Sequence, residues 1–244
     1  MKPEIAFITG ASRGIGRAIA EEFAQAGFSL AINCQNSAPE LEQLAAKLKE
    51  TYHVPCIPLV GDIGREDFVK DAFYMIEEAL GSVTVLVNNA GVSHIGLLSD
   101  MSLGEWNRII QTNLTSLFCC CRQAIPSMVR RRSGKIINIS SVWGNTGASC
   151  EVAYSASKGG VNSFTRALAK ELAPSNICVN AIACGMIDTQ MNQCFSAEER
   201  LLLTEEIPAG RFGTPKEAAL LALSLVTAPS YLTGQIITLD GGWQ

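Results

Sequence analysis

The stretch Thr9-Gly10-Ala11-Ser12-Arg13-Gly14-Ile15-Gly16 decides the fold, because it joins a short apolar run, Ile5–Thr9, to a helical pattern, Gly14–Ala26. Glycines here allow a tight turn, a close approach of the backbone to a phosphate and close packing of helix on strand. The start of the helix adds free N–H groups and a partial positive charge. The spacing G-x-x-x-G-x-G differs from the common G-x-G-x-x-G. Its place between strand and helix nevertheless favours a dinucleotide-binding turn over a purely structural one.

Short apolar runs alternate with longer helical patterns along the rest of the chain. This alternation predicts a parallel sheet that is covered by helices on both faces. Right-handed connections then give the α/β class, with a single doubly wound (Rossmann) domain and a parallel sheet of about seven strands. No linker rich in Pro, Gly or Ser divides the chain, so residues 1–244 are expected to form one dinucleotide-binding catalytic domain.

The boundaries of these elements follow from hydrophobic periodicity and turn residues. The predicted strands are Ile5–Thr9, Phe28–Cys34, Cys56–Val60, Val83–Asn88, Lys135–Ser140, Ile177–Ala183 and Gln235–Leu239. The predicted helices are Gly14–Ala26, Pro39–Tyr52, Asp67–Leu80, Leu103–Arg131 with a candidate kink at Pro126, Ala153–Leu172, Ala197–Leu203 and Pro215–Ala228.

Composition excludes several kinds of chemistry. The net charge of −4 argues against a general nucleic-acid binder. With only two histidines, His53 and His94, a His-rich metal site cannot be built, and a Ser-His-Asp triad would depend on one of them. We therefore expect no metal in the site.

The nine cysteines and the apolar runs indicate the compartment. The number is odd and no C-x-x-C occurs, which favours buried, reduced thiols over disulfides or zinc ligands. No apolar run reaches the ~18 residues of a membrane span. Residues Met1–Glu4 lead straight towards the glycine turn and do not resemble a signal peptide. We expect a cytoplasmic protein without a membrane partner.

The end of the second strand indicates which dinucleotide is bound. NAD sites usually place an Asp or Glu there to hold the ribose hydroxyls. Here the stretch runs Asn33-Cys34-Gln35-Asn36-Ser37 and contains no acid. Arg13 precedes the second glycine of the turn, where a guanidinium can bind a 2′-phosphate. Both observations favour NADP(H), although a solvated loop cation is the alternative for Arg13.

A second group of residues has catalytic chemistry. Tyr154 and Lys158 stand at i and i+4, so they share one face of a predicted helix. A nearby cation lowers the pKa of a phenol, so Tyr154 could act as a general acid or base. Ser141 follows a predicted strand, and ligands bind at the carboxyl ends of strands in open α/β sheets. Its hydroxyl could polarise a carbonyl beside Tyr154.

With these motifs the chain resembles the classical short-chain dehydrogenase/reductase family over essentially its whole length. Asn88-Asn89-Ala90-Gly91 matches the family's N-N-A-G, and Asn113 matches the helix Asn of its catalytic tetrad. The resemblance implies that Tyr154 exchanges a proton with the substrate oxygen, while Lys158 holds the nicotinamide ribose and lowers the Tyr154 pKa. It implies that Ser141 binds the carbonyl and that Asn113 anchors a water-linked proton relay.

The resemblance also implies a set of cofactor contacts. Asp62-Ile63 is similar to the pair that contacts adenine, and Ile187 and Thr189 match the contacts to the nicotinamide carboxamide. The expected cofactor-binding residues are Gly10, Ser12, Arg13, Gly14, Ile15, Gly16, Asn33, Asp62, Ile63, Asn89, Ala90, Gly91, Tyr154, Lys158, Gly185, Ile187 and Thr189.

One departure from the family is visible. Cys184-Gly185 stands where the family usually has Pro-Gly after the sixth strand. Loss of the proline frees one φ angle and restores an N–H, so we expect a looser turn beside the nicotinamide. Cys184 itself is interpreted as an inert small residue, with a reactive thiol as the alternative.

Within the family, the segments Ile207–Gly213 and Thr233–Gly242 look most like those of 3-oxoacyl-acyl-carrier-protein reductases. Those enzymes dock an acidic carrier protein through basic residues. Arg132 falls at one such position, but Ser175 stands where many of them have a second arginine. The resemblance further implies a homotetramer and a substrate lid at about residues 186–212.

The resulting hypothesis is an NADPH-dependent oxidoreductase that reduces a ketone to a secondary alcohol, with a carrier-bound 3-oxoacyl substrate. Three alternatives stay open: a dehydrogenase of sugar alcohols, steroids or other secondary alcohols, a catalytically silent NADP-binding sensor, and a structural subunit in a complex of paralogues. The intact Ser141, Tyr154 and Lys158 argue against the sensor, because a pure binder does not need the tyrosine.

Overall fold

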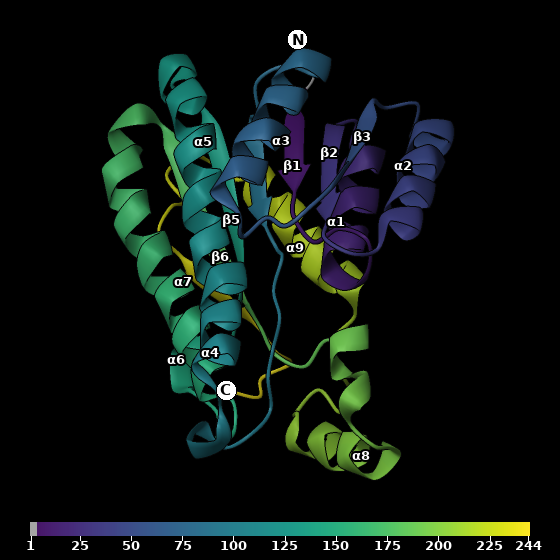
Figure 1. Cartoon of the computed structure of the whole chain (residues 1–244), viewed down its shortest axis with the longest axis vertical. Coiled ribbons are helices and arrows are strands. Elements are labelled where there is room, and N and C mark those ends of the chain that lie inside the picture. The colour runs from purple at the N-terminus through teal and green to yellow at the C-terminus, as the bar shows by residue number, and fades with distance from the viewer. Residues whose placement is uncertain (1–3) are drawn as a thin grey trace.

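The computed structural model describes residues 4–244, with all of their side chains except that of Cys194. The expectations for Met1–Pro3 and for the Cys194 thiol lie outside the described residues. The described chain forms one seven-stranded sheet in the order β3-β2-β1-β4-β5-β6-β7, and every pair of neighbours is parallel (Figure 1). The strands are β1 Ile5–Ile8, β2 Ser29–Cys34, β3 Cys56–Val60, β4 Val85–Asn88, β5 Gly134–Ser141, β6 Ile177–Cys184 and β7 Ile236–Leu239.

Helices cover both faces of this sheet. The α-helices are α1 Gly14–Gln25, α2 Ala38–Tyr52, α3 Glu66–Ala79, α4 Leu103–Ile110, α5 Ser116–Arg131, α6 Trp143–Thr146, α7 Val152–Leu172, α8 Ala197–Glu206 and α9 Pro215–Thr227. Short turns of other helix types are η1 Leu98–Asp100, η2 Gln111–Thr115, η3 Ala173–Ser175 and η4 Gln190–Cys194.

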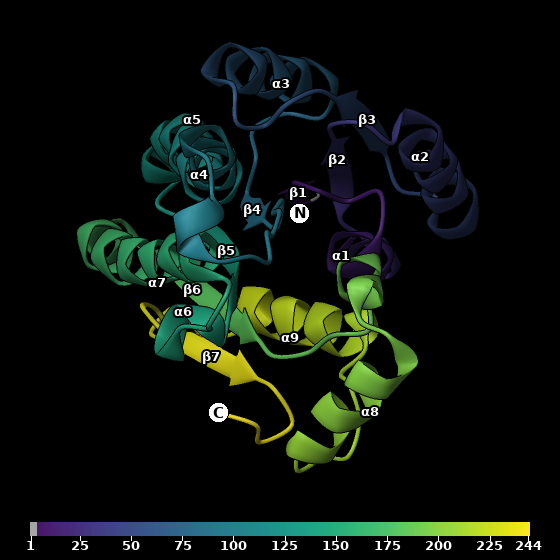
Figure 2. The same cartoon turned by 60° about the horizontal axis from the view of Figure 1, so that its bottom comes forward.

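Two clusters of buried apolar side chains hold the helices against the two faces of the sheet. One packs α1, α2 and α9 on the sheet through side chains such as Phe23, Leu44 and Leu225. The other packs α3, α5 and α7 on the opposite face through side chains such as Ile76 and Met128. Figure 2 shows the two layers, with α8 standing out from both. The predicted Rossmann α/β fold with seven parallel strands is confirmed.

The predicted helix over residues 103–131 is the element that differs most from expectation. It consists of α4 and α5 joined by η2, a π-helical turn at Gln111–Thr115. Pro126 lies inside α5, which continues to Arg131. Periodicity did not predict the π-turn, because one extra residue per turn leaves the apolar pattern helical on both sides.

Among residues 4–244, no helix combines the length and apolar character that a membrane crossing needs.

A buried chain of amide hydrogen bonds joins the centre of the sheet to α7. Asn88 Nδ2 donates to Asn138 Oδ1 at 2.9 Å, and Asn138 Nδ2 donates to Thr165 Oγ1 at 2.9 Å. Asn138 and Thr165 are fully buried. Because a buried polar group costs free energy unless it is paired, this chain fixes α7 against β4 and β5. It thereby fixes the helix that holds Tyr154 and Lys158.

Replacing Asn138 by Ala tests this chain. The substitution leaves the Asn88 amide and the Thr165 hydroxyl without their partner, which costs about 3 kcal/mol of unfolding free energy. We expect a melting temperature lower by roughly 6–12 °C for a chain of this size. The exposed Asn107→Ala on α4 is the control and should leave the melting temperature nearly unchanged. Equal melting temperatures for the two variants would show that the chain does not stabilise the fold.

Candidate active site

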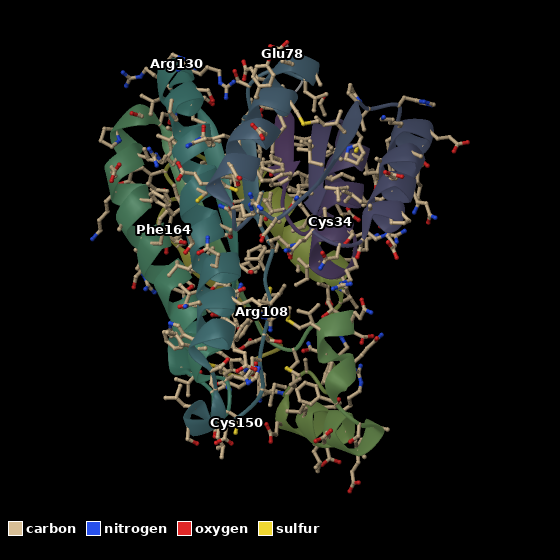
Figure 3. The ribbon with its side chains drawn as sticks, in the orientation of Figure 1. Cys34, Glu78, Arg108, Arg130, Cys150 and Phe164 are labelled. Atoms are coloured by element: carbon tan, nitrogen blue, oxygen red, sulfur yellow. The ribbon has the colours of Figure 1, made fainter. Side chains whose placement is uncertain are left out.

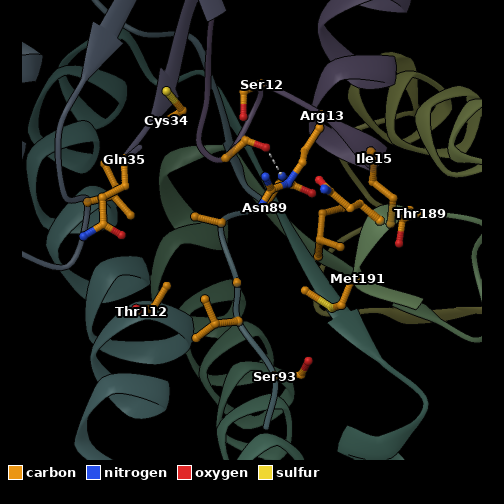
Figure 4. A pocket seen from close by; sticks show the side chains of 18 of the residues that line it. Ser12, Arg13, Ile15, Cys34, Gln35, Asn89, Ser93, Thr112, Thr189 and Met191 are labelled. Carbon is orange, nitrogen blue, oxygen red and sulfur yellow. Dashed lines mark hydrogen bonds between the residues drawn. The ribbon is translucent and has the colours of Figure 1, made fainter. Parts of the chain in front are cut away.

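A cavity of about 600 Å³ opens where the strands end, as the ligand sites of open parallel sheets do. Its wall contains the glycine turn, the ends of the central strands, Ile187 and residues 189–192 (Figure 4). Of the predicted site residues, Gly16 and Asn113 are not part of this wall. The predicted residues that line it are Gly10, Ser12, Arg13, Gly14, Ile15, Asn33, Asp62, Ile63, Asn89, Ala90, Gly91, Ser141, Tyr154, Lys158, Gly185, Ile187 and Thr189.

The glycine turn has the conformation that its residues allow. Gly10 and Gly14 have φ angles of +65° and +55°, which L side chains rarely adopt. A Cβ on Gly16 would lie 2.4 Å from Gly10 O, so helix and turn pack too closely for any side chain there. The side chain of the N-cap residue Arg13 does not cap α1. The first N–H groups of α1 are therefore not capped by that side chain and face the cavity end of the turn, which suits an anionic phosphate.

Asn89 holds the glycine turn in shape. Its Nδ2 donates to the carbonyl oxygens of Thr9 and Gly10, both at 2.9 Å. The Thr9 hydroxyl in turn accepts the backbone N–H groups of Asn89 and Ala90, both at 3.0 Å. Sequence reasoning missed Thr9, although a hydroxyl at the end of a buried strand beside a glycine turn was a usable signal. The N-N-A-G motif thus braces the turn from the neighbouring strand end.

The ribose end of the cavity has no acid from β2. Asn33 Nδ2 donates to the carbonyl oxygens of Leu59 and Gly61, at 3.0 and 3.1 Å, so this amide nitrogen ties β2 to β3. Within the described part of the chain, Asp62 is the one carboxylate on the wall. Three cations line the cavity, Arg13, Lys158 and an arginine that the motifs did not indicate, Arg108 of α4. The excess of positive charge suits a ligand with several phosphates.

Ser141, Tyr154 and Lys158 meet at the other end of the cavity. Ser141 ends β5, and its hydroxyl is hydrogen-bonded to the Tyr154 side chain. Lys158 Nζ lies 5.6 Å from the centre of the Tyr154 ring and donates to Ile139 O at 2.8 Å. Tyr154 and Lys158 lie on one face of α7, as their spacing predicted.

Burial controls the ionisation of these groups. It raises the pKa of Tyr154 well above its usual range, and the Ser141 hydrogen bond only partly opposes this rise. Burial also lowers the pKa of Lys158 to about 8. A pKa of Tyr154 below its usual range, as expected from the nearby Lys158, is therefore not found in the chain by itself, because that expectation neglected the cost of removing a phenolate from water.

Asn113 lies behind the cavity wall in the π-turn. Its Oδ1 accepts Val92 N at 2.8 Å, and its Nδ2 donates to Val92 O at 2.9 Å and to Ser157 Oγ at 3.0 Å. A Cβ on Gly91 would lie 3.5 Å from Asn113 Oδ1 and 3.6 Å from Lys158 Nζ. Asn113 therefore fixes the segment after N-N-A-G against α7, close to the lysine.

The turn at Cys184-Gly185 is held from both sides. Val142 N donates to Cys184 O at 3.0 Å, and Gly185 N donates to Leu239 O at 2.9 Å. The neighbouring strand ends thus supply backbone partners on both sides of the turn, and a turn looser than that of Pro-Gly stays a prediction. Cys184 lines the cavity, but burial raises its pKa to about 12, which disfavours a reactive thiolate.

The segment of residues 186–212 packs as a small cluster of its own beside the cavity. Met186, Ile207 and Phe212 form its buried part. Arg200 of α8 bonds Asp188 at 2.9 Å, and its guanidinium lies 4.6 Å from the centre of the Phe212 ring. Asp188 thus ties α8 to its neighbours Ile187 and Thr189, which line the cavity.

The predicted docking residue Arg132 lies far from this cavity. It caps α5 just before β5 begins, and its Nη2 donates to Pro174 O at 3.3 Å. The eight residues of β5, at about 3.3 Å each, span about 25 Å to Ser141. In Figure 3, Arg130 marks this end of the molecule, whereas Arg108 and Cys150 mark the cavity end.

Among residues 4–244, no three His, Cys, Asp or Glu side chains gather as a metal site would need.

Comparison with known proteins agrees with this geometry. Residues 4–200 match the family model described as short chain dehydrogenase. An uncharacterised oxidoreductase of Bacillus subtilis, YmfI, is 40% identical over 239 residues, 98% of each chain. The 3-oxoacyl-acyl-carrier-protein reductase FabG of Aquifex aeolicus is 39% identical over 243 residues, 99% of this chain and 98% of that one.

A solved structure of similar shape has a different name. The crystal structure of a putative gluconate dehydrogenase from Agrobacterium tumefaciens superposes with a TM-score of 0.93 at 35% identity, over 98% of this chain and 95% of that one. The resemblance inferred from the motifs is confirmed by the family model and the relatives. The chain belongs to the short-chain dehydrogenase/reductase family of oxidoreductases.

Proposed function

We propose that the chain is an NADPH-dependent reductase that converts the ketone of a 3-oxoacyl thioester into a secondary alcohol. The observation that carries the proposal is one cavity with a phosphate-binding turn at one end and Ser141, Tyr154 and Lys158 at the other. A nicotinamide dinucleotide, the cofactor class of this family, would span the two ends and supply the hydride.

The residues of the turn fit this cofactor, and those at the ribose end favour its phosphorylated form. Gly10 and Gly14 hold the turn at positive φ angles, and a Cβ on Gly10 would lie 2.8 Å from Ala90 Cα, so glycine is needed for a turn whose backbone can approach a pyrophosphate. β2 contributes no acidic side chain that could bind a 2′-hydroxyl, and Arg13 lies beside the ribose end of the cavity. A 2′-phosphate would find in Arg13 a guanidinium suited to charge-assisted hydrogen bonds.

The chemical step needs a proton at the ketone oxygen. The Ser141 hydroxyl holds that oxygen beside Tyr154, and the Tyr154 hydroxyl donates the proton. The high pKa of Tyr154 in the chain by itself keeps the phenol protonated and ready to donate. The Lys158 ammonium stabilises the phenolate that remains and binds the ribose, while Asn113 supports the relay that restores the proton.

The substrate class is supported by the relatives. Several curated relatives with about 39% identity are named 3-oxoacyl-acyl-carrier-protein reductases. The similarity to a gluconate dehydrogenase favours oxidation of a secondary alcohol in a sugar acid as the second candidate. Because this scaffold handles many substrates, the side chains of the cavity and not the fold select between the two.

A cytoplasmic homotetramer with a lid at residues 186–212 completes the proposal. Large apolar side chains are exposed on the helices and near the C-terminal strand, among them Phe118, Leu220 and Tyr231. Such surface commonly becomes buried between subunits. The small cluster that carries α8 could close over a bound substrate.

The role of Tyr154 is tested by Tyr154→Phe. Removing the hydroxyl removes the proton donor, so turnover of acetoacetyl thioesters should fall by at least about 10³-fold. NADPH affinity, measured by fluorescence titration, should stay within a few-fold, because the ring remains. The exposed Tyr74→Phe is the matched control. If wild-type protein binds NADPH tightly but reduces none of a panel of thioesters, sugars and steroids, the catalytically silent sensor is the better description.

The cofactor preference is tested at Arg13. Wild-type protein should have a lower KM for NADPH than for NADH, and Arg13→Ala should reduce that preference at least about tenfold by removing charge-assisted hydrogen bonds. Arg17→Ala, one turn further along α1, should leave the preference unchanged. Equal KM values for the two cofactors in wild-type protein would rule out the preference.

Carrier docking is tested by Arg132→Glu. Since Arg132 lies about a strand length from the cavity of its own chain, docking there could serve only the cavity of a neighbouring copy. Charge reversal should raise KM for a carrier-bound 3-oxoacyl substrate several-fold, by repelling an acidic carrier, and leave KM for a small thioester unchanged. Arg130→Glu, at the same end of α5, is the control. The same KM change for both substrates would refute docking at Arg132.

A further inference from the structure

Asn162 is a buried amide of α7 that the proposed mechanism does not use. It follows Tyr154 and Lys158 at the same helical spacing, so the three side chains share one face of α7. Both ends of its amide are paired. Ser140 Oγ donates to Asn162 Oδ1 at 2.6 Å, and Asn162 Nδ2 donates to Asn145 Oδ1 at 2.9 Å. The face of α7 that carries the reacting groups is thus tied to the end of β5 and to α6.

The two partners of Asn162 lie on either side of Ser141. Ser140 precedes it on β5, and Asn145 belongs to α6, which follows it. The backbone N–H of Trp143, at the start of α6, donates to Ser141 Oγ at 3.2 Å. One amide of α7 therefore holds both ends of the short segment that presents the Ser141 hydroxyl to the cavity.

α6 also packs closely against α7 at this place. A Cβ on Gly144 would lie 2.7 Å from the carbonyl carbon of Lys158 and 2.9 Å from Asn162 Nδ2, so there is no room for a side chain on Gly144. Ser140 Oγ lies 3.4 Å from Lys158 O as well. Ser140 and Asn162 are each only 3% exposed, and a buried polar group without a partner is costly. These bonds therefore favour a single placement of α6 and the end of β5 against α7.

We propose that Asn162 is a positioning residue that holds the Ser141 hydroxyl in the place relative to Tyr154 that proton transfer to the ketone oxygen needs. Asn162 lines no part of the cavity and acts through Ser141, which does. A misplacement of about 1 Å in a reacting group can lower a rate about a hundredfold, so support of this kind acts on kcat rather than on cofactor affinity. The inference rests on the proposed function, in which Ser141 holds the ketone oxygen beside Tyr154.

The test is a double-mutant cycle of Asn162→Ala and Ser141→Ala, with NADPH and the N-acetylcysteamine thioester of acetoacetate. In the wild-type background, Asn162→Ala should lower kcat about tenfold and leave KM for NADPH within about twofold, because both bonds to the Ser141 segment are lost. In the Ser141→Ala background, the same substitution should lower kcat less than about twofold, because the hydroxyl that Asn162 positions is absent.

Asn180→Ala is the matched control. Asn180 is a fully buried amide of β6 whose Nδ2 donates to Leu232 O at 2.9 Å and whose Oδ1 accepts Gln235 N at 3.0 Å. Its loss should lower the melting temperature as the loss of Asn162 does, but leave kcat within about twofold when all proteins are assayed well below their melting temperatures.

An unchanged kcat in Asn162→Ala overturns the inference, and so does an equal fold-loss of kcat in the two backgrounds, which indicates a role independent of Ser141. If Asn162→Ala does not fold, Ser140→Ala replaces it in the same cycle, because it removes one of the two bonds of the Asn162 amide.

A readout that needs no turnover separates the inference from the proposed function. The four tyrosines are labelled with carbon-13 at Cζ, and the Tyr154 resonance is assigned by its loss in Tyr154→Phe. This resonance reports the hydrogen bond between Tyr154 and Ser141. In Asn162→Ala it should move towards its position in Ser141→Ala, and a resonance that stays at the wild-type position overturns the inference. If the wild-type protein reduces no thioester, the proposed function fails, and the resonance still decides whether Asn162 positions Ser141.

Discussion

The close approach between the first helix and the fourth strand's end is the constraint on which the rest of the site depends. A Cβ on Gly16 would meet both the Asn89 amide and Gly10 O at 2.4 Å, so there is no room for a methyl group. This contact sets the distance between the turn and the loop that leads to the catalytic end. Because the strands are parallel, everything placed at their carboxyl ends shares that one reference.

Desolvation affects the ionisation of Tyr154 and Lys158 more than their pairwise charge interactions do. The phenol of Tyr154 and the ammonium of Lys158 are both pushed towards their neutral forms. The same burial makes each remaining charge count for more, since water screens it less. A site of this kind is prepared for a ligand that brings negative charge at one end and a neutral reacting group at the other.

The sequence was sufficient for the fold and for most of the wall of the site. Buried parallel strands appear as continuous apolar runs, and the predicted strands start and end within one or two residues of β1 to β7. Thr9, Arg108 and the chain from Asn88 to Thr165 escaped prediction, because their partners lie far away along the chain. The raised pKa of Tyr154 was not predicted for the same reason. It depends on how deeply the phenol is buried by the elements that pack around α7, and the spacing of four residues between Tyr154 and Lys158 does not reveal that depth.

The π-turn of residues 111–115 has a consequence for how the longest helical segment is constructed. Each residue of an α-helix advances the side chains by about 100°, so one extra residue in a turn rotates everything before it relative to everything after it. The π-turn lets Arg108 of α4 line the cavity while Cys120 and Ala124 of α5 pack towards the sheet. If the same residues formed an uninterrupted α-helix, α4 would be rotated by about 100° relative to α5, and Arg108 would turn away from the cavity.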